Sequence, residues 1–326
     1  MKKQIICLVL SLMLVCSAFG FSSAGAEGWE PTKPVSIINY VAAGGAMDVS
    51  TRLFAQIASK YTDATFVVDN KTGAGGLIGM DYVLSQDADG YTIFAGTISN
   101  IAAIVANEES TEHYVWGFTW IDNIMADPFS IMVRDDFEGD LTTLVEQAKA
   151  DGNASIWCGP STGGAKHVAA LQFWNVLGLN PRWVPFESGP LALTAVLGGQ
   201  GVATVGNPSD VNGRELKNLA IATNAKLPNF PDVPNFAECG YPELDKLSMW
   251  RGFAVKDGTP PEMIAWFQDI VQKVTEDEEW IAFFNEKSIV VRNEKTEEFE
   301  KTIQENIDDY IKYLKQFEMI DSDYVG

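Results

Sequence analysis

The chain has few of the residues that most catalytic and metal-binding sites use. It contains two histidines and four cysteines among 326 residues, and it has no C-x-x-C pair. A structural zinc site needs about four such ligands at close spacing, so this sequence gives one no support. We therefore expect neither a bound metal nor a cofactor.

Basic residues are also scarce. Lys and Arg number 23 against 44 Asp and Glu, which gives a formal net charge of −21. This acidity argues against nucleic acids and anionic membranes as partners. A small anionic ligand stays compatible, because hydrogen-bond donors act at contact distance while the charge of the whole surface is screened within about 10 Å.

Outside the N-terminus the chain has no long apolar run. Two lysines precede an apolar stretch at residues 5–21, and Ala24-Gly25-Ala26 follows as a small-residue cleavage motif. This pattern predicts a secretory signal peptide over residues 1–26, too short for a stable membrane span. Cys16 would allow a lipoprotein anchor, but the valine before it is larger than such processing prefers. We expect a protein that is exported to the periplasm or another extracytoplasmic space, without a lipid anchor.

Two cysteines follow the predicted cleavage site, Cys158 and Cys239. Export would permit a disulfide between them. Cysteines this far apart in sequence do not establish one, because a disulfide depends on their geometry in space. The alternative is a pair of small buried thiols, and the sequence leaves both possibilities open.

Strand and helix patterns alternate along the rest of the chain. Apolar strand patterns occur at residues 35–40, 66–68, 91–95, 155–157, 182–186, 202–205 and 219–222. Helical periodicity occurs between them, and a long amphipathic helix is expected over residues 294–317. The alternation predicts an α/β fold with mostly parallel sheets and right-handed crossovers.

Two segments have the pattern of crossovers between lobes, residues 124–133 and 249–255. Hinges at these places divide the chain into a first lobe of residues 27–127 plus 252–326 and a second lobe of residues 128–251. A ligand cleft would then lie at the carboxyl ends of parallel strands in both lobes. Two lobes joined by two hinge strands are the geometry of periplasmic proteins that close around a ligand.

Two glycine-rich turns lie in this framework, one in each predicted lobe. We name residues 42–48 loop 1 and residues 160–167 loop 2. Each follows a predicted strand and opens a helix, so each exposes backbone N–H groups without a helical partner. The helix dipole adds partial positive charge there, and such turns bind anions, carboxylates included. We predict a clamp in which each loop holds one end of a small carboxylate.

The loop residues that we expect at the ligand are therefore those around the glycines. In loop 1 they are Ala43, Gly44, Gly45, Ala46, Met47 and Asp48, with Asp48 expected as a cap of the first helical turn rather than a direct contact. In loop 2 they are Ser161, Thr162, Gly163, Gly164 and His167. A cation is disfavoured in a first helical turn, so we expect His167 to be neutral and to support the loop.

Polar side chains at strand ends give further candidates. Thr97, Ser99 and Asn100 follow one predicted strand, and Asn207 follows another; each either contacts the ligand or only forms the turn. Arg251 lies in a predicted hinge, where it could bind a carboxylate in bidentate fashion. Arg251 and Lys166 either touch the ligand or form ordinary salt bridges.

A series of short motifs runs through nearly the whole chain after residue 26 in a specific order. They occupy residues 43–48, 70–79, 89–92, 159–167, 184–186, 197–200, 233–234, 238–241 and 258–260. In this order they resemble the substrate-binding receptors of tripartite tricarboxylate transporters. Three positions depart from that pattern: Gly164 stands where the family usually has Ser or Thr, Ala203 stands where it usually has Asp, and Arg251 is not expected in most relatives.

This resemblance implies an α/β, class II periplasmic-binding-protein-like fold. It also implies a receptor that binds a small di- or tricarboxylate outside the cytoplasmic membrane and passes it to integral-membrane permease subunits. We expect a monomer without enzymatic activity. The alternatives are a secreted enzyme of similar fold that uses His167, and a chemosensory receptor for the same ligands.

Overall fold

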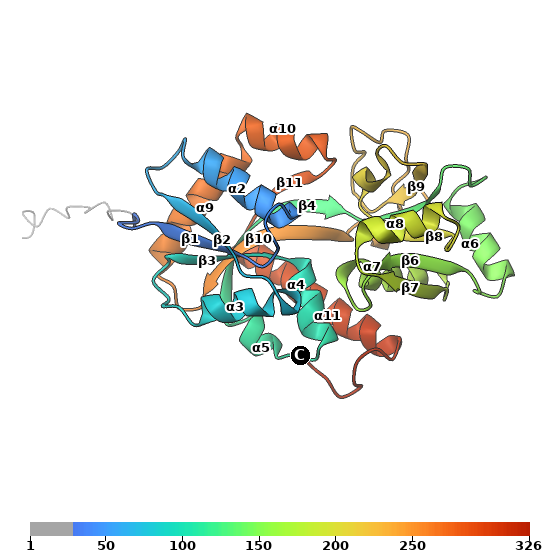
Figure 1. Cartoon of the computed structure of the whole chain (residues 1–326), viewed down its shortest axis with the longest axis horizontal. Helices are drawn as coiled ribbons and strands as arrows, with labels where there is room; N and C mark the ends of the chain where they lie inside the picture. The colour runs from blue at the N-terminus through green and yellow to red at the C-terminus, as the bar shows by residue number, and fades with distance from the viewer. Residues whose placement is uncertain (1–28) are drawn as a thin grey trace, which may run out of the picture.

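The computed structural model describes residues 29–326, so the predicted signal peptide lies outside the described residues. Two lobes lie side by side along the long axis of the molecule (Figure 1). Within these residues the first lobe holds a six-stranded sheet and the second a five-stranded sheet, each covered by helices. The predicted two-lobe α/β fold is confirmed.

The first lobe takes its elements from both ends of the described chain. They are β1 (Val35–Asn39), α2 (Ala46–Ala58), β2 (Phe66–Asn70), η1 (Ala74–Gly76), α3 (Leu77–Leu84), β3 (Thr92–Thr97), α4 (Ile98–Ala106), α5 (Thr111–Tyr114), β4 (Phe118–Pro128), β10 (Ser248–Lys256), α9 (Pro261–Thr275), α10 (Glu278–Glu286), β11 (Val290–Lys295) and α11 (Thr296–Gln316).

The second lobe comes from the middle of the chain. Its elements are β5 (Ser130–Arg134), α6 (Leu141–Ala150), β6 (Ile156–Pro160), α7 (Ala165–Leu177), β7 (Arg182–Phe186), α8 (Gly189–Leu197), β8 (Ala203–Gly206), η2 (Pro208–Val211), β9 (Leu216–Ile221) and η3 (Pro242–Leu244). None of the helices between residues 29 and 326 combines the length and the apolarity needed to cross a membrane.

Both sheets are mixed. In the first, with the order β11-β4-β10-β3-β1-β2, β1 pairs in parallel with β2 and β3, and β10 is antiparallel to β3 and β4. In the second, with the order β7-β6-β8-β5-β9, β6 is parallel to β7 and β8, and β5 is antiparallel to β8 and β9. The expectation of mostly parallel sheets missed these antiparallel strands. They arise because the chain crosses between lobes on β4 and returns on β10, so the two hinge strands run in opposite directions.

The hinge consists of the paired strands β4 and β10. Their pairing continues to the lobe boundary, where the Phe129 N–H donates to the Leu247 carbonyl at 3.0 Å. All of β10, from Ser248 onward, pairs within the first sheet. The largest hydrophobic core is continuous through this region, since it contains Phe129 and Trp250 at the hinge together with Trp174 of the second lobe.

Helix α11 joins the lobes on one side. Its buried residues recur at helical spacing and form one apolar stripe, as expected for an amphipathic helix: Phe299, Ile303, Ile307, Tyr310 and Leu314. The helix lies against α4 of its own lobe and against α7 of the other (Figure 1). The sequence predicted this helix two residues too early, because residues 294 and 295 finish strand β11.

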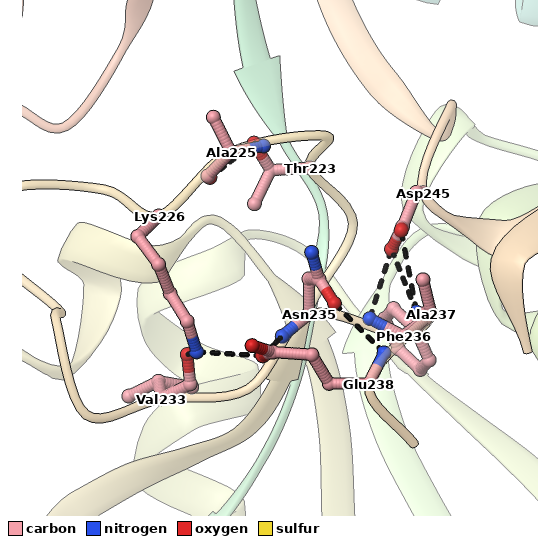
Figure 2. Close-up of polar contacts among 9 residues, drawn as sticks. All are labelled: Thr223, Ala225, Lys226, Val233, Asn235, Phe236, Ala237, Glu238 and Asp245. Carbon is pink, nitrogen blue, oxygen red and sulfur yellow. Dashed lines mark hydrogen bonds and ion pairs between the residues drawn. The ribbon is translucent and has the colours of Figure 1, made fainter. Parts of the chain in front are cut away.

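A long irregular connection leads from β9 into β10, and polar contacts fix its shape (Figure 2). Glu238 accepts from Lys226 Nζ at 2.6 Å and from the Asn235 N–H at 2.9 Å, while Asn235 Oδ1 accepts from the Glu238 N–H at 2.8 Å. The Asp245 carboxylate accepts from the N–H groups of Phe236 and Ala237. These bonds replace the missing sheet ladder and hold the segment that enters the hinge.

Candidate functional site

Loop 1 turns sharply between β1 and α2. Gly44 has a φ of 81°, a left-handed conformation that glycine adopts at little cost. Its N–H donates to Asp48 Oδ2 at 2.9 Å, and the Gly45 N–H donates to the Ala42 carbonyl at 3.0 Å. We expected both N–H groups to bind the ligand. In this structure the loop uses both groups to fix its own shape, and their contact with a ligand stays a prediction.

Asp48 is the residue that holds loop 1. Its side chain is 2% exposed and forms an ion pair with Arg52 at 2.9 Å, while Asn70 Nδ2 donates to it at 2.8 Å. Burial alone would raise the pKa of Asp48, but the bonds from Arg52, Gly44 and Asn70 outweigh it and lower the pKa. The carboxylate is therefore charged and fully engaged in holding the loop through Gly44, although the cap position of α2, Gly45, has no side-chain hydrogen bond.

The remaining donors of loop 1 lie at the start of α2. The first N–H groups of a helix lack an intrahelical acceptor, and the first bond into this turn comes from Val49 to the Gly45 carbonyl. The N–H groups of Ala46 and Met47 have no acceptor among residues 29–326. Ala42, Ala43 and Ala46 are exposed, so this helix start faces open space.

Loop 2 repeats this design. Gly163 has a φ of 74°, and its N–H donates to His167 Nδ1 at 3.0 Å. His167 is 4% exposed, stacks on Trp183 with ring centroids 4.5 Å apart, and has its pKa lowered to about 4 by burial. The imidazole is thus neutral and turned toward its own loop. The Gly163 N–H, like those of loop 1, is not open to a ligand.

A cavity of about 390 Å³ lies where loop 2 faces the first lobe. Loop 2 lines it from Ser161 to Lys166, and the first lobe contributes Tyr40 at the end of β1 and α4 residues from Ser99 to Ala106. A Cβ on Gly163 would come 2.9 Å from the Ala106 Cβ, so the two lobes are in close contact here. The glycines of loop 1 do not line this cavity.

The end of β3 supports the first-lobe wall. Thr97 caps α4: its hydroxyl accepts from the Ser99 N–H at 3.1 Å and lies 2.7 Å from Tyr40 Oη. Asn100 is fully buried and bonds to the Thr97 N–H and to the Gly75 carbonyl. Of these residues Tyr40, Ser99 and Gly75 line the cavity, whereas Thr97 and Asn100 have polar groups committed to the turn.

Two opposite charges are buried on the hinge strands. Arg251 on β10 is 5% exposed and Asp127 on β4 is 6% exposed. Among residues 29–326, Asp127 and Tyr40 act on Arg251 through their charge and not through a hydrogen bond, and Asp127 Oδ1 is buried without a partner. Each charge acts on the other electrostatically, but the side chains do not form an ion pair.

Burial has the largest effect on the pKa of both groups. It raises the pKa of Asp127 to about 7, against the opposing effect of Arg251 and Lys166. It lowers the pKa of Arg251, whereas Asp127 and Tyr40 act to raise it. A buried guanidinium without an acceptor carries a large desolvation cost, and a carboxylate ligand is the partner that would offset it.

Loop 2 is tied to the same place through Lys166. Lys166 Nζ lies 3.0 Å from Asp210 Oδ2, which also accepts from the Asn207 N–H at 3.0 Å. The Asn207 side chain donates to the carbonyls of Asp127 and Pro128 at the hinge. Through these bonds Lys166 and Asn207 connect loop 2, which lines the cavity, to the end of the hinge strand β4.

A second cavity, of about 210 Å³, lies on the other face of the hinge strands. Ser248 and Trp250 line it, whereas Met249 lines the larger cavity, and alternate strand residues point to opposite faces. Two of its polar groups already have partners: Trp250 Nε1 donates to Asn306 at 2.8 Å and Asn123 Nδ2 donates to Glu294 at 2.8 Å. The larger cavity, which loop 2 and Met249 of the hinge strand β10 line, is the better candidate site.

The structure thus brings Ser99, Ser161, Thr162, Gly163 and Gly164 into one cavity, with Arg251 and Asn207 at the adjoining hinge. It leaves Ala43, Gly44, Gly45, Ala46, Met47 and Asp48 outside that cavity. Sequence reasoning missed Tyr40 and Asp127. The signal for Asp127 was available, because it is a lone acid in one apolar hinge segment opposite a lone cation, Arg251, in the other.

Within residues 29–326 no cluster of three His, Cys, Asp or Glu side chains is placed to hold a metal ion. Cys158 and Cys239 are both free thiols, with Cys158 buried in β6. The disulfide that the sequence left open is not formed in this structure.

The chain is similar to a known protein family and to several known proteins. A family model described as the tripartite tricarboxylate transporter family receptor matches residues 50–318. Protein BugT of Bordetella pertussis is 28% identical over 241 residues, which are 72% of this chain and 74% of BugT.

Solved structures share the fold. A TctC solute-binding protein from Polaromonas has a TM-score of 0.77 and 23% identity, over 88% of this chain and 100% of its own. MatC from Rhodopseudomonas palustris, solved with bound malate, has a TM-score of 0.70 and 22% identity, over 87% and 100%. A second R. palustris protein, solved with adipate, has a TM-score of 0.71 and 22% identity, over 87% and 97%.

Proposed function

This chain belongs to the tripartite tricarboxylate transporter receptor family of solute-binding proteins, and on that premise we propose that it captures a small di- or tricarboxylate in the cleft between its lobes. The observation that carries the proposal is Arg251, a buried residue without an ion-pair partner among residues 29–326, two positions along β10 from Met249, which lines the cavity of loop 2. Two neighbours of the same fold were solved with dicarboxylates, malate and adipate.

In this proposal Arg251 binds one carboxylate of the ligand in bidentate fashion. The hydroxyls of Ser99, Ser161 and Thr162 and the open N–H groups at the start of α7 surround the ligand in the cavity. The N–H groups of Ala46 and Met47 meet it when the lobes close. Contacts that exist only in the shut form would drive that closure.

Several predicted residues act indirectly in this proposal. Asp48 and His167 lock their loops, Thr97 and Asn100 hold the start of α4, and Asn207 ties η2 to the hinge. None of these five needs to touch the ligand. Their role is to fix donors in place before binding, which reduces the entropy lost on association.

An enzymatic role would have required His167 as an acid or base. Its Nδ1 accepts from the Gly163 N–H, its ring is buried against Trp183, and His167 is not among the residues that line the cavity. Family relatives and structural neighbours are solute-binding proteins. We propose that the protein acts outside the cytoplasmic membrane and hands its ligand to membrane permease subunits.

The test is a binding screen with purified protein. Succinate, malate, adipate and citrate are added in turn, and unfolding temperature and calorimetric titration are measured, since a ligand specific to the folded state raises the unfolding temperature. We expect at least one acid to bind and Arg251→Met to weaken it about 100-fold, because that variant leaves a buried carboxylate without its cation.

The control is Arg182→Met, which removes an exposed arginine of β7. It should leave the affinity unchanged. The proposal fails if none of the acids binds, or if Arg251→Met folds normally and binds as tightly as the original protein.

A further inference from the structure

The hinge holds a buried carboxylate as well as a buried guanidinium, and a plain dicarboxylate satisfies only one of them. Asp127 lies on β4 and Arg251 on β10, in adjacent antiparallel strands. Neither charge is paired with the other at contact distance, although each is within electrostatic range. Buried charges that are not paired carry a desolvation cost unless a third group pairs with them.

Of the two residues, Asp127 has the polar atom that most clearly lacks a hydrogen-bond partner. Its Oδ1 is buried and accepts no hydrogen bond within residues 29–326. The nearby amide of Asn207 donates to the backbone carbonyls of Asp127 and Pro128, and Lys166 is engaged by Asp210 at 3.0 Å. Asn207 also hydrogen-bonds to the Asp127 side chain, so Oδ1 is the carboxyl oxygen that is left for a ligand donor.

Burial raises the pKa of Asp127 to about 7, and a carboxylate bound at Arg251 would bring a second negative charge close to the charged form of Asp127. Two like charges in a poorly solvated site repel strongly unless a hydrogen atom lies between them. A donor on the ligand carbon next to its carboxylate would lie in that position. It would turn the repulsion into a hydrogen bond to a charged acceptor.

We propose that the ligand carries a hydrogen-bond donor, hydroxyl or ammonium, on the carbon next to one carboxylate, with that carboxylate on Arg251 and the donor on Asp127. The inference rests on the proposed carboxylate-binding function and narrows its substrate class to 2-hydroxy and 2-amino acids. Asp127 is then the residue that selects among acids of equal length.

A matched series of four-carbon acids tests this. Succinate, malate and aspartate differ only in bearing hydrogen, hydroxyl or ammonium at one carbon. By calorimetric titration we expect malate or aspartate to bind about tenfold or more tightly than succinate, since a hydrogen bond to a charged group has about that value. If aspartate is the tightest, the donor is an ammonium; if malate is, it is a hydroxyl.

Two substitutions assign the preference to Asp127. Asp127→Leu removes the acceptor and should bring the three affinities to within about threefold of one another. Asp127→Asn keeps a neutral acceptor, so it should retain a preference for malate and lose one for aspartate. The control Asp232→Asn changes an exposed acid and should leave the order intact.

Other results would overturn the inference. One is succinate binding as tightly as malate and aspartate, with a proton taken up from buffer, because Asp127 would then be a protonated donor to a plain carboxylate. Another is an equal loss for all three acids in Asp127→Asn. In both cases the proposed function stands. If no carboxylate binds at all, both proposals fall.

Discussion

Loops 1 and 2 are built on the same backbone plan in different lobes. Each has a left-handed glycine, a second glycine that caps a helix in extended conformation, and a helix of 13 residues. In each, the left-handed glycine donates its N–H to the side chain four residues later. The sequences align as Gly-Gly-Ala-Met-Asp and Gly-Gly-Ala-Lys-His.

The side chain that accepts this bond is where the loops differ. Loop 1 uses Asp48, a charged group held by Arg52 and Asn70, and loop 2 uses His167, a neutral ring stacked on Trp183. One turn is thus locked by electrostatics and the other by aromatic packing. The comparison teaches that the two glycine turns are rigid before a ligand arrives, and that acid should release them at different pH values.

The largest effect should come from the pH dependence of loop 2. The folded pKa of His167, about 4, is below its unfolded value of about 6.5. Between these values the unfolded chain binds a proton that the folded chain does not, so stability falls as pH drops from about 6.5 to 4. The loss reaches about 3 kcal/mol, and urea unfolding at pH 7 and pH 4 measures it.

His167→Asn is the matched variant, because it keeps an acceptor for the Gly163 N–H without a titrating ring. Its stability should fall about 3 kcal/mol less than that of the original protein over this range. Other buried groups, such as Asp127, titrate in both proteins and cancel in the difference. Equal slopes would show that His167 is already free to take up a proton in the folded state.

The next effect is the loss of the loop 1 charge. Asp48→Asn and His167→Asn place the same side chain at equivalent positions of the two loops. Asp48→Asn also removes a carboxylate that accepts hydrogen bonds from three donors. We expect a loss of about 2 kcal/mol in unfolding free energy at pH 7 by urea titration. The lowered pKa of Asp48 means that its contribution is present above about pH 4 and is lost only below it.

The control is Asp69→Asn on the same lobe, which breaks an ion pair with Lys71 in which Asp69 is largely exposed. It should cost less than about 1 kcal/mol. An equally small loss for Asp48→Asn would mean that solvent, not Arg52 and Asn70, satisfies the carboxylate, and that the loops are not locked in different ways.

The positions of both loops followed from local chemistry. A strand pattern, two glycines and a helical pattern define such a turn without tertiary information, and the strand at 182–186 was placed with its observed bounds for the same reason. Helix α4 was missed, because Thr97, Ser99 and Asn100 look like ordinary loop residues and their capping bonds appear only in the folded structure.

Which N–H groups stay open could not be derived from sequence. It depends on Asp48 and His167 folding back onto Gly44 and Gly163, a choice made by distant partners such as Asn70 and Trp183. The nearness of Asp127 to Arg251 likewise depends on two paired strands that are more than a hundred residues apart in sequence. Nonlocal contacts of this kind set the chemistry of the site.

A smaller effect, on ligand affinity, should distinguish the two loops because their surroundings differ. Gly44→Ala and Gly163→Ala both place a side chain on a left-handed residue, at a cost of about 1 kcal/mol in stability. The Gly44 Cβ would meet open space, whereas the Gly163 Cβ would come 2.9 Å from the Ala106 Cβ in the other lobe. We expect about tenfold weaker ligand binding for Gly163→Ala alone, measured by calorimetry.

Ala106→Gly provides the rescue, because it removes the atom that Gly163→Ala would strike. The double variant should bind within about threefold of the original affinity. If it stays as weak as Gly163→Ala, the backbone strain of loop 2 is responsible, and the close approach of the lobes has no part in the loss.

The smallest effect should come from Lys166→Met. This substitution gives loop 2 the residue that loop 1 has at the same place, Met47. The side chains of Lys166 and Asp210 are 15% and 31% exposed, so their ion pair should contribute less than about 1 kcal/mol to stability. Ligand affinity should fall about threefold at low salt and converge with the original at high salt, because a cation at the cavity wall acts mainly through screened attraction. A salt-independent loss would instead place Lys166 in direct contact with the ligand, and loop 2 would then bind through a side-chain charge that loop 1 does not possess.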